Sequence, residues 1–590
     1  MEFQKGFIFS VEKYIYMPRA IKIIQSGEIT HEGATQYVIS NPLLDLVFTK
    51  GAVRFTKGFY QSQQDEIISF IKALKDAEVY EKGFGWKYGV YVRHPKLGKG
   101  NRIQGSVVPA VLSSFCGEDT YSVDFIKEYV KKSLLYRPDD VVLFVSHWEN
   151  LDLGGIESIP PYIKEAIAST LEEFTDYQIL KYRNIEVDRT SVRFKKDICG
   201  NEISVPKTLR LVDVMGLCYK QLSSRLKNIY AVLHTSKSKI STVIDKWPAY
   251  DLTHSSFKNK EYLNISDFAP SISQALSVFG NNKKTWESLF NSNLVPDMAF
   301  LLNIRNMGKA GYSPEELIEK IGSRQFNGIW PHQVYAGYKA VTIGSYKKNY
   351  VSESMPEYGQ VFNKIFLQIV KNTVPSLRGL GFADVSGSMF TKVSKENSLT
   401  NMDIAKLLCA CVATTSGYAA TFDDNAHIAK FNKDHYVNLF DFVLRHRAMN
   451  CGLGSTQVYG SIIDTLNYII KYSIKPFKIV YFFSDMQFHP PTVIGESLYY
   501  RKFPPLELAL KKWRDTFNET PLIVLWNLAS YEGSPLECSY PGVAFVSGYD
   551  VNIFKHLQNW IANGGNTISK SQITNQEENQ AETLDYIRNF

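Results

Sequence analysis

Cysteine is scarce in this chain, and its distribution excludes two common ways of stabilising a fold. The 590 residues include 7 cysteines, and no two of them form a C-x-x-C pair. An odd number at irregular spacing argues against a disulfide framework and against a structural zinc site. We therefore expect a reducing compartment, in which Cys409 and Cys411 are buried thiols of an apolar helix.

Long apolar runs are lacking as well. No stretch approaches the roughly 18 consecutive apolar residues of a membrane-spanning helix, and no signal-peptide pattern follows Met1. With 44% hydrophobic and 21% charged residues, the composition is typical of a globular protein. We therefore expect a soluble, cytoplasmic protein of about two to four domains that makes no membrane contact. Residence in a virion or another particle stays open.

The short motifs of common enzyme classes are also missing. The sequence has no P-loop, no H-E-x-x-H, no G-x-S-x-G and no dinucleotide-binding fingerprint. We therefore expect a protein that is not an enzyme and has no catalytic residues.

Basic residues are present in slight excess and are unevenly distributed. The formal net charge is +7, and many Lys and Arg residues cluster between 181 and 246, where Asp and Glu are fewer. The cluster includes Lys181, Arg183, Lys207 and Arg210. It indicates either solvated helix faces or contact with phosphates, for which Lys and Arg give affinity without sequence preference.

Residues 105–375 are predicted to be predominantly helical. Apolar residues recur there at i, i+3 and i+4 in many short segments, for example 208–217 and 296–307. A succession of short helices predicts helix pairs stacked as a solenoid rather than one bundle. Residues 1–104, which contain a helical segment at 64–77, are expected to begin the same domain.

The stretch with the clearest chemistry runs from Gly379 to Met389. Its apolar start predicts a buried strand, which ends in Asp384, and Ser386 and Ser388 follow at a spacing of two. A carboxylate and two hydroxyls on a tight loop form a hard-oxygen cluster, which suits Mg²⁺, Mn²⁺ or Ca²⁺ and suits Zn²⁺ poorly. The alternative is an Asp- and Ser-rich turn without a metal.

Two later segments favour the metal. Thr456 lies in a glycine loop that opens a helical pattern, and Asp485 ends a strand-like run that begins at Ile479. In an open α/β sheet, ligands gather at the carboxyl ends of the strands, so we expect these loops to converge.

This ordered set resembles the metal-ion-dependent adhesion site of von Willebrand factor A domains. The resemblance implies one divalent cation held by two carboxylates and three hydroxyls, those of Asp384, Ser386, Ser388, Thr456 and Asp485. Mg²⁺ is the expected ion, with Mn²⁺ and Ca²⁺ as alternatives, and one coordination position is left for a partner's oxygen. Gly-Ser-Thr stands where Gly-Gly-Thr is usual, so either Ser455 or Thr456 faces the ion.

Residues 376–562 are predicted to form this Rossmann-like, doubly wound α/β domain, because strand-like and helix-like segments alternate along them. Asp423 and Asp424 are expected to be solvated acids of a turn, and His489 a residue at the rim of the site. Residues 563–590 are predicted to be a polar tail. It ends in a short patch, Tyr586 to Phe590, that is open to docking on a partner.

Three segments of the helical region resemble the TROVE domain of Ro ribonucleoproteins. The first begins at Tyr162 (Tyr-Ile-Lys-Glu-Ala-Ile-Ala) and continues with Ile179-Leu-Lys-Tyr-Arg and Lys207-Thr-Leu-Arg-Leu. The second begins at Val295 (Val-Pro-Asp-Met-Ala-Phe-Leu-Leu-Asn-Ile-Arg-Asn-Met) and the third at Ile329 (Ile-Trp-Pro-His-Gln-Val-Tyr-Ala-Gly-Tyr-Lys). The family likewise has an A domain directly after these segments, so the resemblance covers residues 105–560.

The resemblance implies a ring of HEAT-like helical repeats that the A domain closes. It also implies a non-catalytic monomer that binds a small structured (Y-like) RNA on its outer basic surface and single-stranded 3′ ends of misfolded RNA in its central hole. Lys181 and Arg183 fall on the family's RNA-contacting step, Lys207 carries over, and we add Arg210 from the basic cluster. Pro206 stands where the family has an RNA-holding histidine, and residues 184–206 depart from the pattern.

The sequence therefore supports two functional hypotheses. The first is Ro-like RNA binding. The second is metal-dependent adhesion, in which the cation captures a carboxylate of a protein partner and the helical region is a scaffold.

Overall fold

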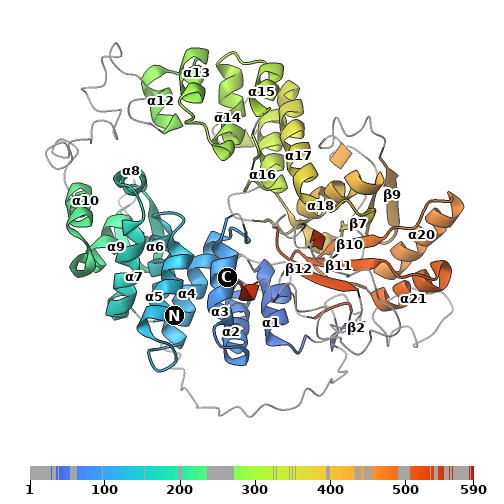
Figure 1. The fold of residues 1–590 in the computed structure, drawn as a ribbon, viewed down its shortest axis with the longest axis horizontal. Coiled ribbons are helices and arrows are strands. Elements are labelled where there is room, and N and C mark those ends of the chain that lie inside the picture. Colours follow the sequence, from blue (N-terminus) through green and yellow to red (C-terminus); the bar gives the residue numbers. More distant parts are fainter. Residues whose placement is uncertain are drawn as a thin grey trace.

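The computed structural model describes the chain from residue 28 to residue 590 with gaps, the longest of which are 30–34, 54–62, 197–201, 235–270, 394–398, 432–439, 444–448, 490–504, 537–541 and 562–583. Two helical bodies and one α/β domain follow each other along the chain, as Figure 1 shows. Among the helices that the structure describes, none is long and apolar enough to cross a membrane.

The first helical body consists of short helices around one apolar core. They are α2 (Gln63–Tyr80), α3 (Phe84–Arg93), α4 (Arg102–Phe115), α5 (Val123–Leu134), α6 (Asp140–Asn150), α7 (Pro161–Glu172), α8 (Asp176–Lys181), α9 (Leu211–Leu217) and α10 (Ser224–His234). Polar residues begin several of them; Thr175, for example, forms a capping box with Gln178 at the start of α8. Helix α3 packs on α4, α4 on α6 and α5 on α7, so neighbouring helices stack as the apolar periodicity predicts.

A long β-hairpin interrupts this body, within a region that we predicted to be predominantly helical. Strands β3 (Glu186–Lys196) and β4 (Glu202–Arg210) pair antiparallel, with Pro206 opposite Val192. The helix predicted from residue 208 is therefore wrong at its start, because residues 208–210 pair in the ladder and α9 begins only at Leu211. Backbone pairing of these three residues with Glu186, Val187 and Asp188 outweighs the weak helical pattern there.

The second helical body shares its core with the α/β domain. Its helices are α12 (Ile272–Phe279), α13 (Lys283–Asn291), α14 (Asp297–Lys309), α15 (Pro314–Ile321), α16 (Pro331–Tyr338) and α17 (Gly359–Thr373). The ring of Phe440 lies 4.8 Å from that of Tyr338 and 4.9 Å from that of Phe366, centroid to centroid. One continuous apolar core therefore joins this body to the A domain.

The A domain is built on a six-stranded sheet. Its strands are β7 (Gly379–Asp384), β8 (Tyr418–Phe422), β9 (Ala426–Lys430), β10 (Ile479–Ser484), β11 (Leu522–Asn527) and β12 (Val543–Ser547). The order is β12-β11-β10-β7-β8-β9, and only the edge strand β9 runs antiparallel to its neighbour.

Helices cover both faces of this sheet. Helix α18 (Asn401–Ser416) packs with Tyr481 and Phe483, whereas α20 (Val458–Lys471) and α21 (Pro505–Phe517) pack with Val480 and Phe482. The alternation follows from the period of two in a strand. Cys409 and Cys411 are buried thiols on α18, as predicted, and burial raises the pKa of Cys409 to about 12.

The first helical body also contacts the A domain, at a seam formed by the π-helix η1 (Asp45–Thr49) and strand β12. The rings of Phe48 and Phe545 lie 5.1 Å apart in an edge-on arrangement. The buried Lys99 ammonium donates to Ser547 Oγ at 3.0 Å. The A domain therefore contacts both helical bodies.

Residues 587–590, which we call the C-terminal clasp, fold back onto the first helical body (Figure 1). The Arg588 guanidinium pairs with the Glu81 carboxylate at 2.6 Å, and the Phe590 ring lies 5.5 Å from that of Tyr91. The predicted terminal patch thus packs, in its described part, against the same chain.

Candidate functional site

Asp384 ends strand β7 and is surrounded by hydroxyl groups. Its carboxylate is fully buried; Oδ1 accepts the Ser386 amide at 2.9 Å, and Ser484 Oγ donates to Oδ2 at 2.5 Å. The hydroxyl oxygens of Ser386 and Ser388 lie 3.3 Å apart. The predicted loop therefore directs its hydroxyls and its carboxylate toward one small region.

Asp485 follows strand β10, the neighbour of β7. Because Phe483 pairs with Ala383 in parallel register, the two strands end side by side and bring the two acids to the same edge. The Gln487 amide donates to Asp485 Oδ1 at 3.1 Å. The intervening Met486 has φ of +62°, a left-handed conformation that costs a non-glycine residue about 1–3 kcal/mol and is frequent at functional sites.

Thr456 lies on a loop that crosses above the end of β7. Its amide donates to His489 Nδ1 at 3.0 Å and its carbonyl accepts the His489 amide at 2.9 Å, on the side of β10. On the side of β8, the Gln457 amide donates to the Asp423 carbonyl at 2.8 Å. Since β7 lies between β10 and β8, Thr456 is held over the loop that begins at Asp384. Ser455 lies outside the described residues.

The donor set fits a hard divalent cation. Its five side chains are oxygen donors and each is at most 5% exposed; they are Asp384, Ser386, Ser388, Thr456 and Asp485. Burying two carboxylates in one place is costly unless a cation or hydrogen bonds compensate, and oxygen-only ligands are those that Mg²⁺ and Ca²⁺ prefer. The described residues hold no group of three or more His, Cys, Asp and Glu side chains that could bind a metal, so such a site depends on the hydroxyls.

The predicted RNA-contacting step lies at the end of α8. Lys181 is its last residue and is exposed, and Arg183 is half-buried with Nη1 donating to the Leu180 carbonyl at 3.3 Å. The ring of Tyr182, between them, has the Arg137 guanidinium 5.1 Å from its centroid. This cation–π contact ties the step to the loop before α6.

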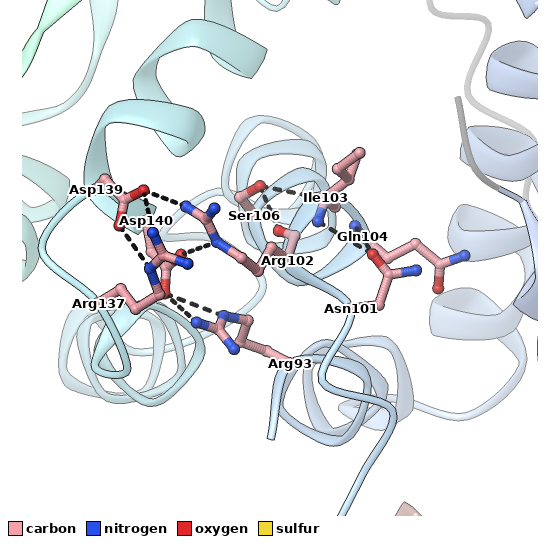
Figure 2. Close-up of polar contacts among 9 residues, drawn as sticks. All are labelled: Arg93, Asn101, Arg102, Ile103, Gln104, Ser106, Arg137, Asp139 and Asp140. Carbon is pink, nitrogen blue, oxygen red and sulfur yellow. Dashed lines mark hydrogen bonds and ion pairs between the residues drawn. The ribbon is translucent and has the colours of Figure 1, made fainter. Parts of the chain in front are cut away.

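Arg137 belongs to an ion network that Figure 2 shows in full. Its Nε and Nη2 donate to Asp139 at 3.0 and 3.1 Å, and Arg102 binds both Asp139 and Asp140. Arg93 reaches Asp140 at 2.6 Å. Burial raises the pKa of Asp140 above its ordinary value, although Arg93 and Arg102 act in the opposite direction. The network carries one more guanidinium than carboxylates, and it holds Arg137 in place against Tyr182.

The two remaining predicted contacts lie on or beside β4. Lys207 is part of that strand, and its side chain lies outside the described residues. Arg210 is the last residue of β4. Its amide donates to Asp213 Oδ2 at 2.8 Å, and its guanidinium pairs with the same carboxylate at 3.3 Å. The charge of Arg210 is therefore already balanced within the chain.

Comparison with known proteins adds the family context. A model for a domain of unknown function (DUF7788) matches residues 378–588, and a search of curated proteins finds no match. Among solved structures, the chain is similar to the crystal structure of the Deinococcus radiodurans Ro (RSR) protein. That similarity has a TM-score of 0.52 at 13% identity and covers 88% of this chain and 99% of the other.

The chain has the Ro fold. This likeness confirms the predicted architecture, a helical repeat region followed by an α/β von Willebrand factor A domain. In the Ro fold of this chain the helical part also includes α2 and α3, which precede the residues that the sequence resemblance covers.

Sequence reasoning missed three residues of these sites. Ser484 precedes Asp485 directly, so a serine beside a strand-ending aspartate was a usable signal. His489 was expected only at the rim, whereas it fixes the Thr456 loop. Arg137 acts through Tyr182 from the loop before α6, more than 40 residues earlier in the chain, and no local pattern indicates such a pairing.

Proposed function

We propose that this protein is a non-catalytic RNA-binding protein. It would bind a small structured (Y-like) RNA on the basic surface of the first helical body and single-stranded 3′ ends of misfolded RNA inside the ring, as a monomer in the cytoplasm. The observation that carries this proposal is the Ro fold over 88% of the chain, together with the basic step at Lys181 and Arg183.

Phosphate contact would supply most of the affinity. Lys181 is exposed and Arg183 follows within the same turn, so both cations can approach one RNA backbone. Each phosphate neutralised releases condensed counterions, and binding therefore weakens steeply with salt. Arg210 is expected to contribute less, because Asp213 already neutralises it.

The A domain would bind one divalent cation, most simply Mg²⁺. Asp384 and Asp485 would supply the negative charge, and the three hydroxyls of Ser386, Ser388 and Thr456 would complete the protein's part of the coordination. The cation would supply a positive charge and an open coordination position for an oxygen of a partner.

One observation favours adhesion as a second function of the same edge. Phe390 is 50% exposed and lies two residues after Ser388. An exposed aromatic ring beside a cation that accepts a carboxylate would anchor a protein partner, since aromatic residues dominate interface energetics. The partner would present an Asp or Glu next to an apolar side chain.

Titration with RNA distinguishes the two functions. The full chain is titrated with a structured small RNA carrying a single-stranded 3′ tail, at several salt concentrations, with and without EDTA. We expect tight, tail-dependent binding that weakens with salt. Loss of binding in EDTA would assign the cation a part in holding the RNA. Absence of binding at low salt would overturn the RNA proposal and leave metal-dependent adhesion as the candidate.

A further inference from the structure

An aromatic ladder lies at the surface of the first helical body. It is formed by Tyr219 on the 3-10 turn η4 (Tyr219–Gln221) and by Tyr230 and His234 on α10. Ring centroids are 5.2 Å apart between Tyr219 and Tyr230 and 4.5 Å apart between Tyr230 and His234.

The ladder is open to solvent and carries positive charge. Tyr219 is 46% exposed, and His234 is exposed as well. The Lys227 ammonium lies 5.4 Å from the centroid of the Tyr219 ring, and the neighbouring Lys220 is exposed. The ladder therefore presents aromatic rings and ammonium groups together at the surface.

The framework beneath the ladder is fixed independently of it. Leu226, Ile229 and Val232 form the buried face of α10. At the start of the helix, Arg225 pairs with Glu172 of α7 and with Asp176 of α8, each at 2.8 Å. The ladder can therefore lose a ring without losing its scaffold, and the scaffold is joined to the helix that ends in Lys181.

The chain has a second aromatic pair near a lysine, and its position differs from that of the ladder. Tyr468 and Tyr472 on α20 have rings 4.6 Å apart, with the Lys471 ammonium 5.4 Å from the Tyr472 centroid. That pair lies on the A domain, whereas α10 lies beside α8 in the first helical body (Figure 1). Of these two aromatic groups, the ladder is therefore the one that adjoins the helix ending in Lys181.

We propose that the ladder of Tyr219, Tyr230 and His234 stacks unpaired nucleobases of a single-stranded RNA segment. Every base has a π-face, so stacking on tyrosine and histidine rings is tolerant of sequence, and Lys220 and Lys227 are placed to meet the adjoining phosphates. This inference rests on the proposed RNA binding and adds to it a subsite for bases rather than phosphates.

Substitution of Tyr219 tests the proposal in the full chain. Tyr219→Leu is expected to weaken binding of an RNA with a single-stranded segment about tenfold, whereas Tyr219→Phe keeps the ring and the affinity. The slope of affinity against salt stays unchanged in both, because no phosphate contact is removed. Tyr472→Leu is the matched control and should bind as the unsubstituted protein does.

Three results would overturn the inference while leaving the proposed function intact. They are unchanged affinity in Tyr219→Leu, an equal loss for a blunt fully duplexed RNA, and an equal loss in Tyr472→Leu. Failure of the proposed function is distinguishable, because the unsubstituted protein would then bind neither RNA at low salt.

Discussion

Thr456 and His489 are joined by a reciprocal pair of hydrogen bonds. The Thr456 amide donates to His489 Nδ1 at 3.0 Å, and the His489 amide donates to the Thr456 carbonyl at 2.9 Å. The pair links the loop before α20 to the loop after β10, so the hydroxyl of Thr456 and the carboxylate of Asp485 depend on each other for their positions.

This relationship predicts graded effects on metal binding. Asp384→Ala should abolish the rise in melting temperature that Mg²⁺ produces, because it removes a buried charged ligand. His489→Ala should shift the Mg²⁺ titration to concentrations about 10–100-fold higher, the usual cost of losing a residue that orients a ligand. Thermal unfolding across a Mg²⁺ series measures both, with Asp515→Ala on the exposed side of α21 as control. Equal thermal shifts in Asp384→Ala and the unsubstituted protein would refute the site.

A second prediction concerns the basic step. Replacing Lys181 and Arg183 with Ala should weaken RNA binding and reduce the slope of log affinity against log salt by about 1.4–1.8, since each phosphate contact contributes about 0.7–0.9. Arg210→Ala should change the slope less, because Asp213 already pairs with that guanidinium. Filter binding at a series of salt concentrations gives both slopes. A double variant with the original slope would remove Lys181 and Arg183 from the RNA footprint.

The ion pair between Arg588 and Glu81, which holds the C-terminal clasp, can be tested by exchanging its two charges. Arg588→Glu should loosen residues 587–590 and cost about 1 kcal/mol, because the pair with Glu81 is about one-third exposed and such pairs are weak. Combining it with Glu81→Arg should restore the contact. The rate of limited proteolysis at the C-terminus reports the effect, with Arg514→Glu, an exposed residue of α21, as the matched charge reversal. Equal cleavage of all variants would show that the ion pair adds nothing to the apolar contact of Phe590.

A buried histidine predicts how stability varies with pH. Burial lowers the pKa of His147 from 6.5 to about 4, so between these values the unfolded chain binds a proton that the folded chain does not. Stability should therefore fall as pH is lowered through this window, by about 2 kcal/mol at pH 5 relative to pH 8. His147→Leu removes this contribution. Urea unfolding at both pH values should show the smaller loss in the variant; identical losses would assign the acid sensitivity to other groups.

Much of the A domain is predictable from the sequence, because its buried strands are short apolar runs that end in chemically distinctive residues. The run that ends in Asp384 and the run that ends in Asp485 are β7 and β10 almost residue for residue. The parallel pairing rule then brings both acids to one edge. The coordination itself stays a prediction.

The hairpin and the long-range contacts are not predictable in the same way. Strand β3 carries charged residues among its few apolar ones, so its sequence shows neither the apolar period of a helix nor that of a strand. Its pairing with β4 decides the structure. The contact of Phe48 with Phe545 and that of Arg137 with Tyr182 join segments whose local patterns contain no information about each other.

The seam has a consequence for the synthesis of the chain. Phe48 and Phe545 are almost 500 residues apart, which at about 5–20 residues per second separates their emergence from the ribosome by about 25–100 seconds. Throughout that time the apolar face of η1 has no partner from β12 to cover it. The nascent chain must therefore protect this short segment, by transient contacts or by a chaperone, until the last strand of the sheet is made.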